Sequence, residues 1–278
     1  LFQRLVSSST AAILSAMQGR LERLRLGEES SLDDYAHEVD HGFEENGEEI
    51  DFEGIFQSNT LGLANEEELL TQLIEQAIEC LKTETDAKAD ALLNKIQELK
   101  QLQINQELKI LVFAEFRTTQ KMLVDFFKSK GFIVNHIHGG QDLDERKRAL
   151  AHFKNEAQIL IATDAAGESL NMQFCHIVFN YDLPWNPMMI EQRIGRVDRI
   201  GQKHPVQAFN MLTNNSVDLR VYEVMVEKLN NIIEQLGIDK TSDVLDSAID
   251  MKKVNKLYLQ SLLDPERFEF AGVRWLND

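Results

Sequence analysis

Three features are scarce in this sequence, and each scarcity argues against a class of protein. The two cysteines, Cys80 and Cys175, stand far apart in apolar stretches, so neither a disulfide framework nor a zinc knuckle is indicated. No run approaches the roughly 20 apolar residues that cross a bilayer, and residues 1–25 lack the order of a signal peptide. We therefore expect a cytoplasmic protein without a membrane partner.

Lysine and arginine are missing between Leu26 and Leu81, which concentrates the negative charge there. That stretch holds 17 of the 46 acidic residues, and the rest of the chain has 29 acidic and 29 basic residues. The net charge of -17 therefore leaves room for phosphate contacts, which need Lys and Arg. The part from Glu28 to Glu53 is typical of a solvated acidic insert. A strip that docks a protein partner or mimics nucleic acid is the alternative.

A P-loop is also missing. No string of the form G-x-x-x-x-G-K-[ST] occurs, and neither does an Asp-Glu-x-His or Asp-Glu-x-Asp box. A P-loop cradles the β and γ phosphates of a nucleotide and helps to place magnesium. We therefore expect this chain to hydrolyse no ATP by itself.

Apolar residues at helical spacing dominate the first hundred residues. They predict a helix from Leu1 to Leu26, with Ser8, Ser9 and Thr10 as possible caps, and a second helical region from Glu66 to about Leu102. We interpret residues 1–105 as a helical lead-in that carries the acidic insert at about 27–60.

From Lys109 onwards, short apolar runs alternate with amphipathic stretches, as in parallel strands linked by crossover helices. The predicted strands are residues 110–114, 132–137, 158–162, 176–180 and 206–211, and the predicted helices are 119–130, 143–154, 167–172, 187–199 and 216–236. The fold class is therefore α/β, a parallel sheet with helices on both faces over residues 106–237, with a C-terminal helical extension over 238–278. Such a sheet binds ligands at the carboxyl ends of its strands.

The strongest functional signal is the segment QRIGRVDRIGQ, residues 192–202. On a helix of about 100° per residue, Gln192, Arg196 and Arg199 fall within roughly 60° of one another. The planar fork of arginine holds two phosphate oxygens, so this face suits a phosphate group. By spacing alone, a surface helix in which Glu191 and Asp198 pair with the arginines remains an alternative.

This segment resembles motif VI of superfamily-two helicases, and its ending RIGQ is similar to the Swi/Snf group of ATP-dependent DNA translocases. Other segments resemble further motifs of that family in the expected order: ILVFAEFRTT at 110–119, HGG at 138–140 with Glu145 and Arg146, and ATDAAGESLN at 162–171. The segment DLPWNP at 182–187 is closest to the bacterial branch that includes the RNA-polymerase-associated ATPase. The resemblance covers about residues 109–212 and implies a RecA-like lobe, the C-terminal half of a motor.

The resemblance also implies roles for individual residues. Arg196 and Arg199 match the arginine fingers that reach ATP held by the other lobe, and Gln192 matches the glutamine that leads the motif. Gly167 and Glu168 match the side of motif V that approaches the nucleotide, while Ser169 stands where relatives usually have Gly. The residues implied to contact nucleic acid are Thr163, Phe116, Arg117, Thr118, His138 and Gly139, with a strand end and helix cap as an equal alternative for 116–118.

The implied cofactor is ATP, with magnesium bound mainly by an N-terminal lobe. The implied partners are double-stranded DNA, with RNA as an alternative, the N-terminal RecA-like lobe of the same protein, and RNA polymerase or another DNA-bound protein. No metal site is predicted, because His136 and His138 have no third ligand nearby. Two other functions stay open: a non-catalytic RecA-like module that docks a partner through residues 28–53, and a lobe of a strand-separating RNA or DNA helicase.

Overall fold

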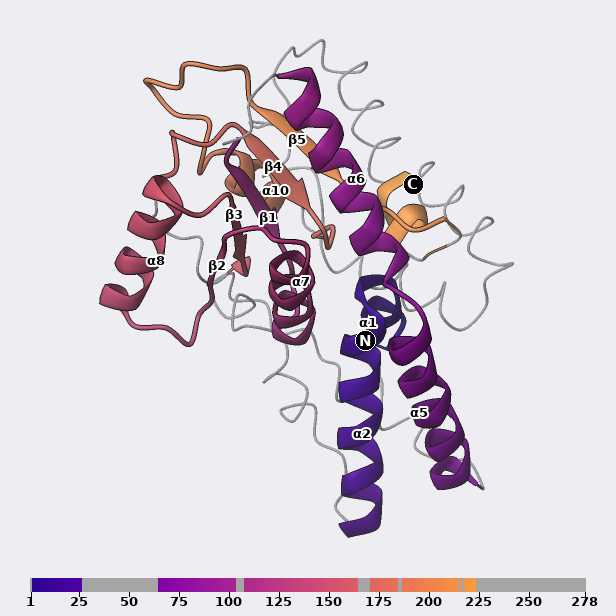
Figure 1. Cartoon of the computed structure of the whole chain (residues 1–278). Helices are drawn as coiled ribbons and strands as arrows, with labels where there is room; N and C mark the ends of the chain where they lie inside the picture. The colour runs from indigo at the N-terminus through magenta and orange to yellow at the C-terminus, as the bar shows by residue number, and fades with distance from the viewer. Residues whose placement is uncertain are drawn as a thin grey trace, which may run out of the picture.

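The computed structural model describes residues 2–26, 65–103, 108–164, 171–184, 187–214, 216 and 218–223. They contain a five-stranded parallel sheet with the strand order β2-β3-β1-β4-β5 (Figure 1). Its strands are β1 (Ile110–Phe113), β2 (Val134–Ile137), β3 (Ile159–Ala162), β4 (Ile177–Asn180) and β5 (Gln207–Asn210). All five lie within the predicted runs. The predicted acidic insert and the C-terminal extension lie outside the described residues.

The sheet is covered on both faces. Every residue of β1, β3 and β4 is buried. Along β1, Ile110 and Val112 belong to one apolar cluster, while Leu111 and Phe113 belong to another. Successive side chains of a strand point to opposite faces, so an unbroken apolar run is what a doubly covered parallel sheet requires.

Three helices supply most of this cover. Helices α6 (Ala87–Leu102) and α7 (Arg117–Ser129) pack on one face, and α8 (Leu143–Asn155) packs on the other. Gly131, with a φ of 83°, follows α7 where the sequence predicts the helix to end. Because α6 belongs to the core of the sheet, the packed lobe begins before residue 106.

The helical lead-in is broken twice. Its first helix is divided into α1 (Phe2–Ser8) and α2 (Thr10–Leu26), because Ser9 Oγ accepts the Ala12 N–H at 3.1 Å and caps a new helix. The second region is divided into α5 (Glu66–Thr83) and α6. Helices α2 and α5 lie side by side and extend away from the sheet (Figure 1). The buried residues of their seam are Met17, Leu21, Leu70 and Ile74.

Two predicted helices near the motifs differ from the structure. Helix α10 (Pro187–Ile194) ends five residues before the predicted end at Arg199. Residues 171 and 172 are not helical, and the rest of the predicted helix 167–172 lies outside the described residues. Beyond β5, residues 218–223 are helical, within the predicted helix 216–236. No helix in the described parts of the chain is long and apolar enough to span a bilayer.

Candidate nucleotide and nucleic-acid interface

Carboxylates follow three neighbouring strands at their carboxyl ends. Glu115 follows β1, Asp164 follows β3 and Asp182 follows β4, and these strands are adjacent in the sheet. The Glu115 main-chain N–H donates to the Asp182 carboxylate at 2.9 Å. The sequence thus brings its acidic strand ends together at the edge where a parallel sheet binds ligands.

Arg193, near the end of α10, is the anchor at this edge. Its Nε and Nη2 each donate to one oxygen of the Asp164 carboxylate at 2.6 Å. Its Nη1 donates to the Asn180 side chain at 3.0 Å and to the Asp182 carbonyl at 2.8 Å. The guanidinium lies 5.0 Å from the centroid of the Phe113 ring, and Arg193 is 2% exposed. A bidentate pair fixes geometry, so Arg193 holds the end of α10 against β3 and β4.

Neither Arg193 nor Asp164 is among the site residues predicted from the sequence. A signal was present, because Asp164 comes two residues after a fully apolar strand. A carboxylate so close to a core needs a hydrogen-bonded cation. What the sequence leaves undecided is which of three nearby arginines supplies it.

Arg196 and Arg199 lie in a turn after α10, which corrects the predicted helix. The Arg196 N–H donates to Arg193 O at 3.2 Å and the Val197 N–H donates to Ile194 O at 3.0 Å, a tightening of the last helical turn. Val197 is fully buried in the cluster on the α8 face of the sheet, which draws the chain inwards. Gln192 and the two arginines therefore do not share one helix face.

The two predicted fingers differ in exposure. Arg199 is exposed, and Arg196 is half-buried. Within the described residues, Arg199 donates from Nε to the Gly195 carbonyl at 3.1 Å, and no ion pair joins Arg199 to Glu191 or Asp198. The buried ion pair of this segment thus belongs to Arg193, while Arg199 presents its guanidinium at the surface.

Of the described residues of motif V, Ala162 and Thr163 are buried, Asp164 is half-buried and Asn171 is exposed. Thr163 is 0% exposed, and its N–H donates to the Ile137 carbonyl at 3.1 Å. Neither its side chain nor its N–H is available to a phosphate, so this arrangement does not support the predicted nucleic-acid contact. Gly167, Glu168 and Ser169 lie outside the described residues.

Phe116 is a core residue, which corrects its predicted place on a nucleic-acid track. It is 1% exposed and packs against Leu5, Ala12 and Ala16 of α1 and α2. Phe116 also occupies the N-cap position of α7. Phe116 therefore fits the alternative given for residues 116–118, in which the segment ends a strand and begins a helix.

The other predicted contact residues lie at the start of α7 and on the loop after β2. Arg117 is exposed, while Thr118, His138 and Gly139 are half-buried. A Cβ atom added to Gly140 would lie 3.3 Å from His138 Nδ1 and 3.6 Å from Arg117 Nη1. Both side chains therefore lie against this glycine, and together they form one small polar surface.

The charge of this surface comes from arginine. The His136 ring stacks on the neighbouring histidine at 5.8 Å, and burial, followed by Lys128 and Arg117, lowers the pKa of His136. His136 is therefore neutral near pH 7. Arg146 Nη2 donates to the Gly139 carbonyl at 2.6 Å and holds the loop from α8. The result is a fixed loop beside an exposed guanidinium, which suits a phosphate backbone.

Comparison with known proteins identifies the lobe. Residues 93–201 match the family model of the helicase conserved C-terminal domain. This segment is a helicase C-terminal domain. It contains α10, the anchor Arg193 and the turn with both predicted fingers.

Two bacterial proteins are among the sequence relatives of this chain. An uncharacterised ATP-dependent helicase of Bacillus subtilis, YqhH, is 39% identical over 129 residues, which are 46% of this chain and 23% of the relative. The RNA polymerase-associated protein RapA of Pseudomonas putida is 36% identical over 149 residues, which are 52% of this chain and 15% of the relative. This chain thus spans less than a quarter of either relative.

A solved structure shares the fold. The helicase domain of Hef from Pyrococcus furiosus superposes with a TM-score of 0.51 at 22% identity, covering 79% of this chain and 40% of that chain. At this level of identity the likeness concerns the fold alone. It agrees with a RecA-like parallel sheet, the fold class that the sequence predicts.

A buried charge network links the lead-in to the helicase C-terminal domain. Arg4 of α1 pairs with Glu115, and Lys88 of α6 lies 3.4 Å from the Asp182 carboxylate. Burial raises the pKa of Glu115 to about 7, with Asp182 among the carboxylates that add to the increase and Arg4 opposing it. Sequence reasoning missed this network because it joins residues more than 60 positions apart.

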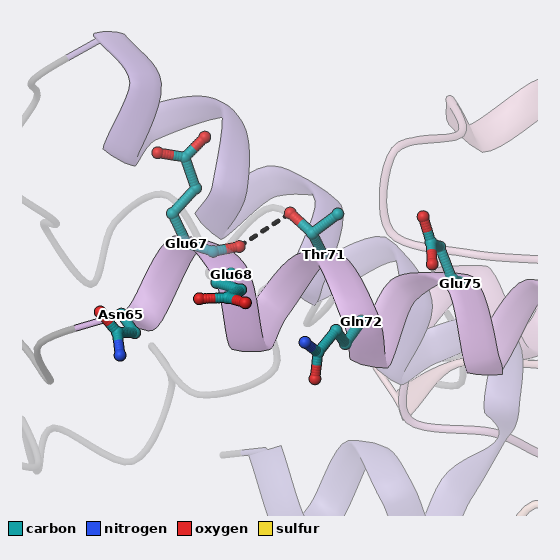
Figure 2. A pocket seen from close by; sticks show the side chains of 6 residues that line it. All are labelled: Asn65, Glu67, Glu68, Thr71, Gln72 and Glu75. Atoms are coloured by element: carbon teal, nitrogen blue, oxygen red, sulfur yellow. Dashed lines mark hydrogen bonds between the residues drawn. The ribbon is translucent and has the colours of Figure 1, made fainter.

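The depression in Figure 2 lies elsewhere, along α5 of the lead-in. Thr71 donates to the Glu67 carbonyl at 2.7 Å, and Glu67 pairs with Arg25 at 2.8 Å. Glutamates dominate its lining, and carboxylates repel phosphate. This surface therefore does not suit a nucleotide or nucleic acid. Its lining residues are Asn65, Glu67, Glu68, Thr71, Gln72 and Glu75.

Proposed function

We propose that this chain is the C-terminal motor lobe of an ATP-dependent DNA translocase of the Swi/Snf type. Arg196 and Arg199 reach the triphosphate of an ATP that an N-terminal RecA-like lobe holds, with Gln192 beside them. The cleft between the lobes closes on ATP and opens after hydrolysis, and alternate grip moves the protein along double-stranded DNA. Magnesium is held mainly by the other lobe, because this sequence has no P-loop.

The contrast between Arg193 and Arg199 carries this proposal. Arg193 is 2% exposed and makes four hydrogen bonds, whereas Arg199 is exposed on the turn that follows. Stabilising a transferring phosphoryl group depends on the position of the cation. A buried arginine that fixes the base of the turn and an exposed arginine at its tip together meet that requirement.

The proposed DNA track runs over the start of α7 and the loop after β2. Arg117 supplies a cation for a phosphate, and Gly139 allows the backbone to approach closely. Thr118 and His138 flank them. Phe116 and Thr163 are left out, because both are buried. The similarity to an RNA polymerase-associated protein makes RNA polymerase on DNA a candidate partner of the full-length protein.

A strand-separating helicase is the second candidate function, favoured by the helicase among the relatives. Unwinding of a duplex by the full-length protein supports this function. Displacement of a third strand from a triplex without unwinding supports translocation. A non-catalytic interaction module is disfavoured, because docking a protein gives no reason for a buried anchor beneath an exposed arginine.

The test is DNA-stimulated ATP hydrolysis by the full-length protein. We expect kcat to fall roughly 10³-fold or more in Arg196→Ala and Arg199→Ala, as for other arginine fingers, while DNA affinity stays unchanged. Arg148→Ala is the matched control, because Arg148 is exposed on α8. The present chain alone should give no turnover. Normal kcat in both finger variants would reject the proposal.

A further inference from the structure

Gln202 lies one residue past the segment that matches the helicase family, yet its side chain is among the most heavily bonded near the arginines. Its Oε1 accepts the main-chain N–H of Lys203 at 2.9 Å and of His204 at 3.1 Å. These two donors fix the orientation of the amide group. Nε2 must then point the other way, towards acceptors.

The acceptors of Nε2 belong to two different segments. Nε2 lies 3.0 Å from the Val197 carbonyl, inside the arginine turn. It also lies 3.0 Å from the Gln173 carbonyl and 2.9 Å from the Cys175 carbonyl, just before β4. One amide group thus bridges the turn that carries the fingers and the segment that leads from motif V into the sheet.

Further bonds join the same two segments. The Met172 N–H donates to the Arg196 carbonyl at 3.1 Å, and the Gln173 side chain donates to the Ile200 carbonyl at 3.0 Å. Gly201 has a φ of 104°, a conformation that side chains rarely adopt, and it turns the chain so that Gln202 points back beneath the turn. The main chain of the arginine turn is therefore bonded to residues 172–175 along its length.

We propose that Gln202 is a positioning residue for the arginine turn. It acts through Val197 and the turn's main chain, and it does not touch the nucleotide. Among the described residues, Arg199 donates to Gly195 of its own turn, so contacts of the turn's main chain decide where its guanidinium stands relative to the sheet. This inference rests on the proposed finger role of Arg196 and Arg199.

The test is Gln202→Glu in the full-length protein. A carboxylate has the same size but only accepts hydrogen bonds, so it faces three carbonyl oxygens without a donor. We expect kcat for DNA-stimulated ATP hydrolysis to fall roughly 10- to 100-fold, the effect of displacing a catalytic group by about 1 Å. The KM for ATP and the affinity for DNA should stay within about threefold. Gln97→Glu is the matched control, because Gln97 is exposed on α6.

A second measurement separates positioning from simple stability. In the triple variant Gln202→Glu with Arg196→Ala and Arg199→Ala, the loss of kcat should be no greater than in Arg196→Ala with Arg199→Ala, because both guanidiniums that the turn positions are already absent. A purely structural role predicts that kcat per folded molecule, measured well below Tm, is normal in Gln202→Glu and Gln202→Asn. That result would overturn the inference.

The two proposals fail in different ways. Normal kcat in Arg196→Ala and Arg199→Ala removes the finger role itself. Impaired finger variants together with a wild-type kcat in Gln202→Glu remove only the positioning role of Gln202. Losses that multiply in the triple variant also contradict the positioning role, because independent contributions add in free energy.

Discussion

At the scale of single residues, the site depends on a charge that is out of reach of solvent. The Arg193 guanidinium donates hydrogen bonds to the Asp164 carboxylate, the Asn180 side chain and the Asp182 carbonyl. Removing one partner of a buried ion pair leaves the other charged and unpaired, which destabilises more than the pair stabilises. Loss of Arg193 should therefore lower the stability of the fold, whereas loss of Arg199 should lower the rate of catalysis.

We predict that Arg193→Ala lowers the free energy of unfolding by roughly 3 to 5 kcal/mol. Urea unfolding of this chain measures the change. Arg193→Lys should lose less, because it keeps the cation but not the planar fork that bonds both Asp164 oxygens. The exposed Arg148→Ala should stay within about 0.5 kcal/mol. Equal stability of Arg193→Ala and the unchanged chain would contradict the anchoring role.

Glu115 predicts how stability changes with pH. Its pKa is raised from 4.5 to about 7 in the folded protein, so the folded chain binds this proton more tightly than the unfolded chain does. The contribution of Glu115 is therefore fully present below about pH 4.5 and is lost as pH rises to about 7, by up to about 3 kcal/mol.

Unfolding curves of the unchanged chain and of Glu115→Gln, measured at several pH values, isolate the contribution of the Glu115 carboxyl group to stability. The variant keeps an uncharged side chain beside Arg4, so its stability relative to the unchanged chain should rise between pH 4.5 and 7. A pH-independent difference for Glu115→Gln would show that the carboxylate is ionised at no cost.

At the scale of elements, two neighbouring residues at the start of α7 have different roles, one in the core and one at the surface. Phe116 packs inwards against α1 and α2, and Arg117 points outwards beside His138. The lead-in helices therefore dock on the sheet lobe beside the surface proposed to contact DNA. Ser8 and Ser9 support the docking through hydrogen bonds to Thr119 at 2.8 and 2.7 Å.

Substitutions of Phe116 and Arg117 should affect different properties, the first stability and the second DNA affinity. Phe116→Ala should destabilise the chain by roughly 3 to 5 kcal/mol, as large-to-small changes in a core do, and should leave the DNA affinity of the folded protein unchanged. Arg117→Ala should lower DNA affinity and its salt dependence, with stability within about 0.5 kcal/mol. Thermal unfolding and a DNA-binding titration measure both. Loss of DNA affinity in Phe116→Ala without loss of stability would support a direct contact of Phe116 with DNA and contradict its role in the core.

At the scale of the whole molecule, charge and packing separate into different parts of the chain. The net negative charge arises between residues 26 and 81, where 17 acidic residues occur without a lysine or arginine. The described acidic residues of this stretch lie on α5, which extends away from the sheet (Figure 1). The remainder is balanced, with 29 acidic and 29 basic residues, and it includes the surfaces proposed for ATP and DNA. This separation allows an acidic protein to carry a lobe that approaches phosphates, because screening limits the reach of charge to about 10 Å.

The sequence by itself determined the parallel sheet, its five strands and the family of the lobe. Buried parallel strands are continuous apolar runs and the motifs are contiguous strings, so both are local properties of the chain. The sequence also predicted the end of α7 at residue 130, directly before Gly131. It named Ser9 as a possible cap but predicted one helix across that position, where the structure has two.

Only the tertiary structure decided which arginine is buried. Spacing placed Arg196 and Arg199 on one helix face, but the burial of Val197 and the bonds of Arg193 to β3 and β4 end that helix at Ile194. The tertiary structure also decided that Phe116 packs against α1 and α2 and that Glu115 forms an ion pair with Arg4. These contacts join residues distant in sequence, and their energies depend on burial, which no short segment contains.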